Sequence, residues 1–190
     1  MNLKEFDTFC LVGGTGLALR YGHRMSVDLD FFSYEDYDTA ALVDALLKEF
    51  THKLELESKR PKWGIFCFID GIKTDIVHYP HPTIRPPETI DGIRLYSSPD
   101  IAAMKINAIL GRGKKKDFWD LAQLLLHYKL KELITFHKQK YPAQNLLITI
   151  PQAITYFDDA EESEDPVSLK DQTWSSVKKI IQKSVKEYLS

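Results

Sequence analysis

The chain has 190 residues, of which 44% are hydrophobic, and a formal net charge of −2 at pH 7. This length and apolar content predict one globular domain, or one with a helical extension, and exclude a disordered chain. The overall charge gives no sign of nucleic-acid binding, so any such contact has to come from a local basic patch.

Cysteine usage and hydropathy predict a cytoplasmic protein. Cys10 and Cys67 lie far apart and lack metal-ligand spacing, which is typical of buried free thiols in a reducing compartment. Charged residues at positions 4, 5 and 7 exclude a signal peptide. No apolar run approaches the ~18 residues of a membrane helix, so no membrane contact is expected.

The first half of the chain alternates strand and helix signals. Runs of β-branched and aromatic residues predict strands, and apolar residues three and four positions apart predict helices. The expected strands are 9–12, 26–32, 52–58, 63–70 and 72–79, and the expected helices are 15–21 and 37–50. Gly22 ends the first helix, and Asp70-Gly71 is a typical hairpin turn. A proline-rich loop, 80–89, closes this half.

The second half has helical periodicity. The expected helices are 98–113, 115–128, 131–141 and 171–189, the first of them capped by Ser98-Pro99-Asp100. The apolar segment 144–157 is ambiguous, and the acidic run 158–165 is expected to be a solvated linker. The layout predicts an α/β core over 1–97 and a helical region, 98–190, packed on it.

Asp28 and Asp30 lie one residue apart in an apolar run. On a strand both carboxylates would point to one face, where they repel each other unless a proton or a cation intervenes. Magnesium prefers oxygen ligands and keeps waters or substrate phosphates as the rest of its shell. The pattern therefore predicts a magnesium platform.

An Asp-x-Asp pattern is a weak signal by itself, since the chain holds a second copy. Asp36-Tyr37-Asp38 lies just before a predicted helix, where aspartates serve as caps. The first copy differs by its apolar strand and by the glycine turn upstream.

That turn, Gly13-Gly14-Thr15, joins a strand to a helix. Backbone N–H groups at a helix start bind anions, and phosphates fit such a site. The alternative is a tight turn with Thr15 as the helix N-cap. Next to the carboxylate pair, the turn predicts a nucleoside triphosphate bound with magnesium.

A third carboxylate, Asp75, interrupts the apolar strand 72–79. It is a candidate metal ligand, or a general base for an attacking hydroxyl. The alternative is an edge-strand charge that discourages aggregation.

Five basic residues fall between positions 105 and 116. Lys105 has apolar neighbours and is expected to enter a cleft, as a counter-charge for phosphate. Lys114 and Lys115 are typical of a solvated face near a helix end. Asp117 and Asp120 also fit a simple role as first-turn acids.

Three stretches, 13–32, "KTDIV" at 73–77 and 100–125, resemble in their order the AbiEii/AbiGii nucleotidyltransferases. These are toxins of abortive-infection toxin–antitoxin systems, within the DNA polymerase beta-type superfamily. The resemblance implies a mixed, mainly antiparallel sheet with flanking helices and a helical C-terminal part. It also implies magnesium-dependent transfer of a nucleotide from a nucleoside triphosphate.

The resemblance also implies roles for matching residues. The glycine turn would hold the triphosphate, Asp28 and Asp30 would bind magnesium, and Lys105 would contact the triphosphate. Asp75 would be the third acidic strand position, as metal ligand and catalytic group. The full set of expected site residues has two parts. The catalytic residues are Asp28, Asp30, Asp75 and Asp117, and the nucleotide-binding residues are Gly13, Gly14, Thr15, Arg24, Ser26, Lys105, Arg112 and Lys116.

The expected function is nucleotidyl transfer to an acceptor hydroxyl, on a tRNA 3′ end or a protein, by a toxin with a cognate antitoxin. No DNA partner is expected. One alternative is a scaffold of the same fold that binds a partner protein without catalysis. Another is a small-molecule nucleotidyltransferase that modifies an antibiotic or a sugar.

Overall fold

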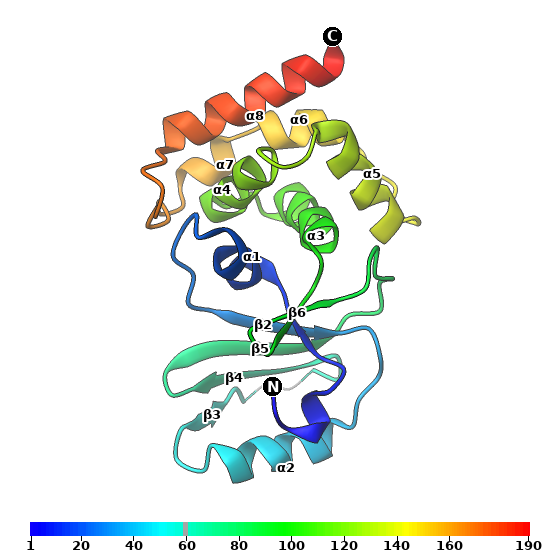
Figure 1. The fold of residues 1–190 in the computed structure, drawn as a ribbon, viewed down its shortest axis with the longest axis vertical. Helices are drawn as coiled ribbons and strands as arrows, with labels where there is room; N and C mark the ends of the chain where they lie inside the picture. Colours follow the sequence, from blue (N-terminus) through cyan, green and yellow to red (C-terminus); the bar gives the residue numbers. More distant parts are fainter. Residues whose placement is uncertain (59–60) are drawn as a thin grey trace.

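The computed structural model describes residues 1–58 and 61–190, which form a mixed seven-stranded sheet with helices around it (Figure 1). The strand order is β3-β4-β5-β2-β1-β7-β6. The pairs β2·β5 and β1·β7 are parallel and the other four are antiparallel, so the expected sheet type is confirmed. The strands are β1 (Cys10–Leu11), β2 (Leu29–Ser33), β3 (Leu54–Leu56), β4 (Gly64–Ile69), β5 (Ile72–His78), β6 (Glu88–Ile90) and β7 (Ile93–Leu95).

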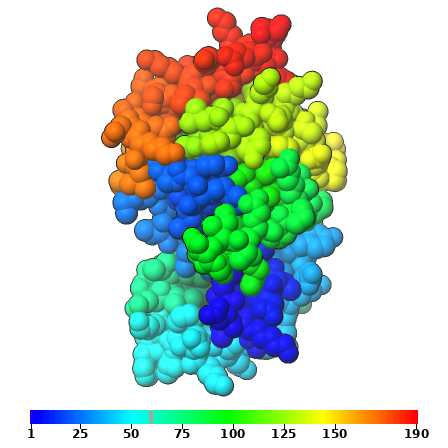
Figure 2. Space-filling view, viewed as in Figure 1, coloured from blue at the N-terminus to red at the C-terminus, as the bar shows by residue number. Residues whose placement is uncertain are grey.

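The helices lie in two groups. In Figure 1, α2 lies at one end beside β3 and β4, and the other α-helices lie on the opposite side of the sheet, from α1 next to the sheet to α8 at the far end, where the chain also finishes. Figure 2 shows the same division on the surface of an elongated molecule. The helices are η1 (Lys4–Phe6), α1 (Gly13–Tyr21), α2 (Thr39–Glu49), α3 (Ser98–Gly111), α4 (Lys115–Leu124), α5 (Leu130–Lys140), α6 (Ile150–Thr155), α7 (Asp158–Glu161) and α8 (Trp174–Leu189).

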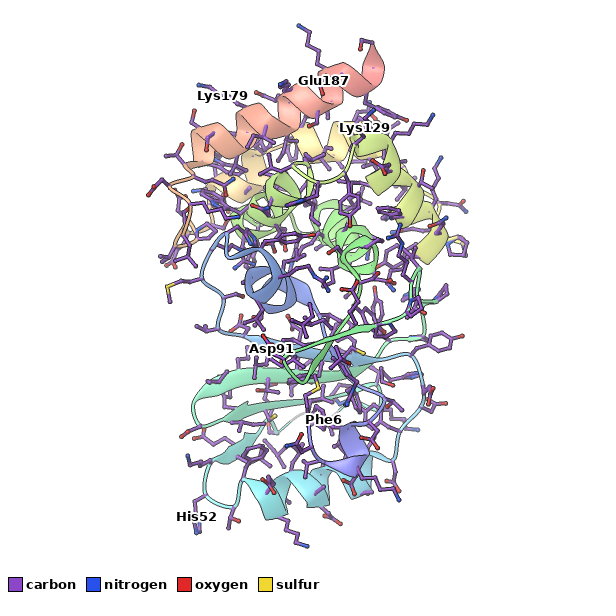
Figure 3. All side chains as sticks on the ribbon, in the orientation of Figure 1. Phe6, His52, Asp91, Lys129, Lys179 and Glu187 are labelled. Carbon is purple, nitrogen blue, oxygen red and sulfur yellow. The ribbon has the colours of Figure 1, made fainter. Side chains whose placement is uncertain are left out.

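Two apolar clusters hold the helices to the sheet. Leu42 and Leu46 of α2 pack with Ile65 and Cys67 of β4. Since side chains alternate along a strand, Phe66 between them points to the opposite face. The second cluster joins α1 and the C-terminal helices, and α8 contributes to it from one side only, since Lys179 and Glu187 project outward (Figure 3). The expected boundary at residue 97 stays a prediction.

Local signals worked where one residue type decides the backbone. Gly22 ends α1 with φ +57°, and Asp70-Gly71 turns between β4 and β5 with φ +53° and +76°. Asp38 caps α2 by accepting hydrogen bonds from the N–H groups of Ala40 and Ala41. The second Asp-x-Asp is therefore a helix cap, as expected.

Other boundaries differ from the expectations. Helix α1 begins at Gly13, after Val12, so Thr15 is inside the first turn and is not the N-cap. Ser97, one residue earlier than expected, caps α3. Strand β2 begins at Leu29 and leaves Asp28 in the preceding segment.

Two segments carry more structure than the sequence indicated. Residues 88–95 form the hairpin β6–β7, around Asp91-Gly92 with φ +49° and +77°. The acidic run 158–165 opens with α7, and Glu161 accepts hydrogen bonds from Trp174 Nε1 and Lys178 Nζ. In residues 1–58 and 61–190, each helix is too short or too polar to cross a lipid bilayer.

Candidate active site

Asp30 and Asp75 are direct neighbours on the parallel strands β2 and β5, at the same register position. Both side chains line one cleft of about 620 Å³ between the sheet and α3. Gly13, Lys105 and Arg112 line the same cleft. Five of the expected residues thus meet in one place.

The carboxylate pair has the electrostatics of a cation site. Burial raises the pKa of Asp30, and the neighbouring Asp75 carboxylate raises it further. Lys73 Nζ donates to Asp75 Oδ2 at 2.6 Å, whereas the buried Asp75 Oδ1 has no hydrogen-bond partner among the described residues. A divalent cation would remove the repulsion and satisfy that oxygen, so these residues fit magnesium.

Asp28 lies at the margin of this pair. Its side chain is 43% exposed, and Oδ2 is 3.6 Å from Lys116 Nζ. Within the described ranges, no group of three or more His, Cys, Asp or Glu side chains is arranged to hold a metal ion. The structure therefore pairs Asp30 with Asp75, and Asp28 is the outer carboxylate.

Two glycines let the start of α1 approach the site closely. Gly13 has φ +67°, and a Cβ there would lie 2.6 Å from Asp30 Oδ2. A Cβ on Gly14 would lie 2.1 Å from Arg24 Nη2. The N-cap is Val12, whose hydrocarbon side chain cannot accept the first N–H groups of the helix. The helix start therefore keeps its capacity to bind an anion.

Thr15 ties the helix to the segment that carries Asp28. Its Oγ1 lies 2.9 Å from Ser26 Oγ and also within hydrogen-bond distance of the Asp28 carbonyl oxygen. Arg24, Ser26, Asp28 and Lys116 line a second hollow of about 490 Å³. Arg24, Ser26 and Lys116 are expected nucleotide contacts and Asp28 an expected metal ligand, and none of the four is among the residues that line the carboxylate cleft.

Lys105 belongs to a buried charge cluster. Its Nζ lies 3.0 Å from Asp117 Oδ1 and 2.7 Å from Asp120 Oδ2. Asp120 also accepts from Arg24 Nε at 2.7 Å, and its Oδ1 is 2.7 Å from His23 Nε2. Burial alone would raise the pKa of Asp120, but these cationic and hydrogen-bonding neighbours hold it well below its usual range.

The cluster separates the two acids of α4 from solvent. Asp117 and Asp120 are fully buried, and exposed Arg112 approaches Asp117 Oδ2 at 3.5 Å. Burial favours the neutral form of Lys105, yet the two carboxylates outweigh it and raise its pKa. Lys105 therefore stays charged at the edge of the cleft, and Asp117 acts on the site through it.

Sequence reasoning missed several residues at the site. The sequence pattern predicts that Asp120 is an ordinary first-turn acid, and it indicates no role for Trp63, Phe66 or Lys73. The strand pattern held one usable signal, because Lys73 lies two residues before Asp75 and so on the same face.

The family match covers almost the whole chain. A family model described as "Nucleotidyl transferase AbiEii toxin, Type IV TA system" matches residues 2–179. The chain belongs to this family. It is thus a member of the AbiEii nucleotidyltransferases, and nucleotidyl transfer is its enzymatic class.

The chain is also similar to individual proteins. An uncharacterised protein of Aquifex aeolicus (strain VF5) is 36% identical over 197 residues, covering 100% of this chain and 92% of the relative. The nucleotidyltransferase toxin MenT4 of Mycobacterium tuberculosis H37Rv has a TM-score of 0.65 at 14% identity, covering 94% of this chain and 74% of MenT4. A candidate nucleotidyltransferase from H. pylori has a TM-score of 0.57 at 20% identity, covering 97% of this chain and 91% of the H. pylori protein. These two structures share the fold of this AbiEii protein.

Proposed function

We propose that this AbiEii nucleotidyltransferase transfers a nucleotidyl group from a nucleoside triphosphate to an acceptor hydroxyl, with magnesium. The observation that supports this is the register pairing of Asp30 with Asp75 against the helix start at Gly13. A carboxylate pair and an anion site in contact suit a triphosphate with its cation.

Asp30, Asp75 and, from the margin, Asp28 would hold magnesium. The bound ion supplies charge stabilisation for the triphosphate oxygens during transfer. The N–H groups of Gly13 and Gly14 and the Arg112 side chain provide positive charge for the phosphates, with Lys116 at the second hollow. Lys105, oriented by Asp117 and Asp120, is the cation at the cleft edge.

The transfer itself is a displacement at the α-phosphorus. The acceptor oxygen forms a bond to that phosphorus, the bond to the pyrophosphate oxygen breaks, and the hydroxyl proton passes to Asp75. Pyrophosphate leaves with the electron pair of the broken bond. Because no other covalent chemistry is needed, catalysis consists of positioning and charge stabilisation.

The same proposal covers the biological role. The protein acts as a toxin in the cytoplasm, is neutralised by a cognate antitoxin, and modifies the hydroxyl of a tRNA 3′ end or of a protein. Family membership supports the toxin and the antitoxin, while the choice of nucleotide and acceptor calls for experiment.

The test is calorimetric binding of each of the four nucleoside triphosphates with and without magnesium. Wild type should bind at least one of them only with magnesium, and the double variant Asp28→Asn/Asp30→Asn should not. Asp44→Asn, on the exposed face of α2, is the matched control. Wild type that binds none of the four would overturn the proposal and favour a scaffold for a partner protein.

A further inference from the structure

Two aromatic side chains line the cleft beside the carboxylates. Trp63 lies just before β4 and Phe66 lies within it, and both contribute to the lining that contains Asp75. Their ring centroids are 5.1 Å apart, with an interplanar angle of 77°. Trp63 is 55% exposed, so most of its apolar surface adds nothing to the core. A large ring held open in a catalytic cleft is placed to contact a ligand.

The strand register puts Phe66 in the row of the catalytic carboxylates. Phe66 of β4 pairs with Asp75 of β5, which in turn pairs with Asp30 of β2. Side chains of antiparallel partners share a face with Cβ atoms about 5 Å apart. Since Gly13 touches Asp30, the phosphate end of the row and its aromatic end lie on opposite sides of Asp75.

The aromatic pair is fixed by the backbone below it. A Cβ on Gly64 would lie 3.1 Å from Phe66 Cε2, so the glycine lets the ring lie close over the strand. The Trp63 carbonyl accepts a hydrogen bond from the His78 N–H at 2.9 Å, which ties the turn to β5. The rings are thus part of the sheet edge of the cleft.

We propose that Trp63 and Phe66 form an aromatic platform that stacks against a nucleobase of the acceptor, next to the attacking hydroxyl. This inference rests on the proposed nucleotidyl transfer, in which Asp75 receives the hydroxyl proton. Aromatic rings stack on any base, which suits an unpaired strand end. Exposed Lys62 and half-exposed Lys73 add positive charge for the backbone phosphates of that strand.

The experiment uses the fluorescence of Trp63. The other two tryptophans, Trp119 and Trp174, are 1% and 9% exposed, so an exposed-tryptophan signal comes from Trp63. The probes are a single-stranded tetraribonucleotide with a free 3′ hydroxyl, the same oligonucleotide with an abasic 3′ residue, and each triphosphate with magnesium. The intact oligonucleotide should quench the fluorescence, the abasic one should bind about tenfold more weakly, and the triphosphates alone should leave the signal unchanged.

Substitutions provide the second measurement. Trp63→Leu and Phe66→Leu should each weaken oligonucleotide binding about tenfold in an anisotropy assay, with triphosphate binding by calorimetry unchanged. Phe68→Leu is the matched control, because Phe68 is 37% exposed on the same face of β4 and is not among the described residues that line the cleft. It should leave both affinities as in wild type, and thermal melts verify that all three variants fold.

Three results would overturn the platform. They are quenching by a triphosphate alone, equal binding of the abasic and intact oligonucleotides, and an equal loss of affinity in Phe68→Leu. A different outcome is that wild type binds no triphosphate while the oligonucleotide still quenches its fluorescence. That result would contradict the proposed transfer but would still support the base-stacking site. The two ideas therefore fail in distinguishable ways.

Discussion

Asp30 of β2 and Asp75 of β5 face the same cleft from one register position, 45 residues apart in the chain. The pairing puts two carboxylates at adjacent positions of neighbouring strands, where like charges destabilise the sheet. Lys73, which donates to Asp75 Oδ2, offsets part of this repulsion, and the charges of Lys105 and Lys116 also act on Asp30. A bound cation would remove the remaining repulsion, so the strand register itself favours cation binding.

The first prediction concerns the pH dependence of this repulsion. The pKa of Asp30 is raised in the folded protein, so ionisation costs stability as pH rises from the unfolded value of about 3.9 through the folded pKa. Without magnesium at pH 7, Asp30→Asn should therefore be more stable to urea than wild type. The difference in stability between the two proteins should vanish below pH 4, where wild type and Asp30→Asn both carry a neutral group at this position. Asp44→Asn should show no such difference.

The Asp30–Asp75 pair also marks what the sequence could predict. Local chemistry was sufficient for the turn at Asp70-Gly71, the end of α1 at Gly22 and the cap at Asp38, since neighbouring residues decide each of these. The sequence predicts Asp28 and Asp30 as the carboxylate pair because they are neighbours in the chain, with Asp75 as a candidate third ligand. The partner on β5 follows from strand pairing, which depends on the packing of the whole sheet.

The buried charges show the same limit more strongly. Asp120 reads as a first-turn acid, yet its partners Arg24 and His23 come from a segment almost a hundred residues earlier. Lys105 was expected to enter the cleft as a phosphate contact, and the structure also gives it two carboxylate partners. No periodicity within α3 or α4 encodes contacts between separate elements.

A second prediction isolates the role of Gly13. Gly13→Ala combines a positive φ with a Cβ placed 2.6 Å from Asp30 Oδ2, so it should destabilise the fold and abolish triphosphate binding. Gly71→Ala is the control, because Gly71 also has a positive φ, +76°, but a Cβ there would meet no atom of the described residues within 4 Å. This control should lose only the backbone cost of about 1–2 kcal/mol and keep its binding. Equal binding by both variants would contradict the close approach of α1 to Asp30.

A third prediction addresses the buried cluster. Lys105→Met removes the cation between Asp117 and Asp120 and should cost about 3–5 kcal/mol in the free energy of unfolding. Adding Asp117→Asn should restore part of this, because one uncompensated buried charge disappears. Lys178→Met, which breaks the partly exposed pair with Glu161, should cost far less, because solvent screens that pair. Urea titrations of the four proteins measure these differences, and a stable Lys105→Met protein would count against the cluster.

The last prediction follows from His137, which is buried in α5 and packs on Tyr141 with ring centroids 5.0 Å apart. Burial lowers the pKa of His137 to about 4, against an ordinary value of 6.5, so the unfolded chain binds a proton before the folded one does. The contribution of His137 to the free energy of unfolding is therefore fully present above pH 6.5. As the pH drops toward 4, about 3 kcal/mol of it is lost. His137→Phe keeps the ring and removes the titration. The difference in unfolding free energy between the two proteins, measured by urea titration, should shift by that amount between pH 7 and pH 4. A difference that does not change with pH would show that His137 is protonated equally in both states.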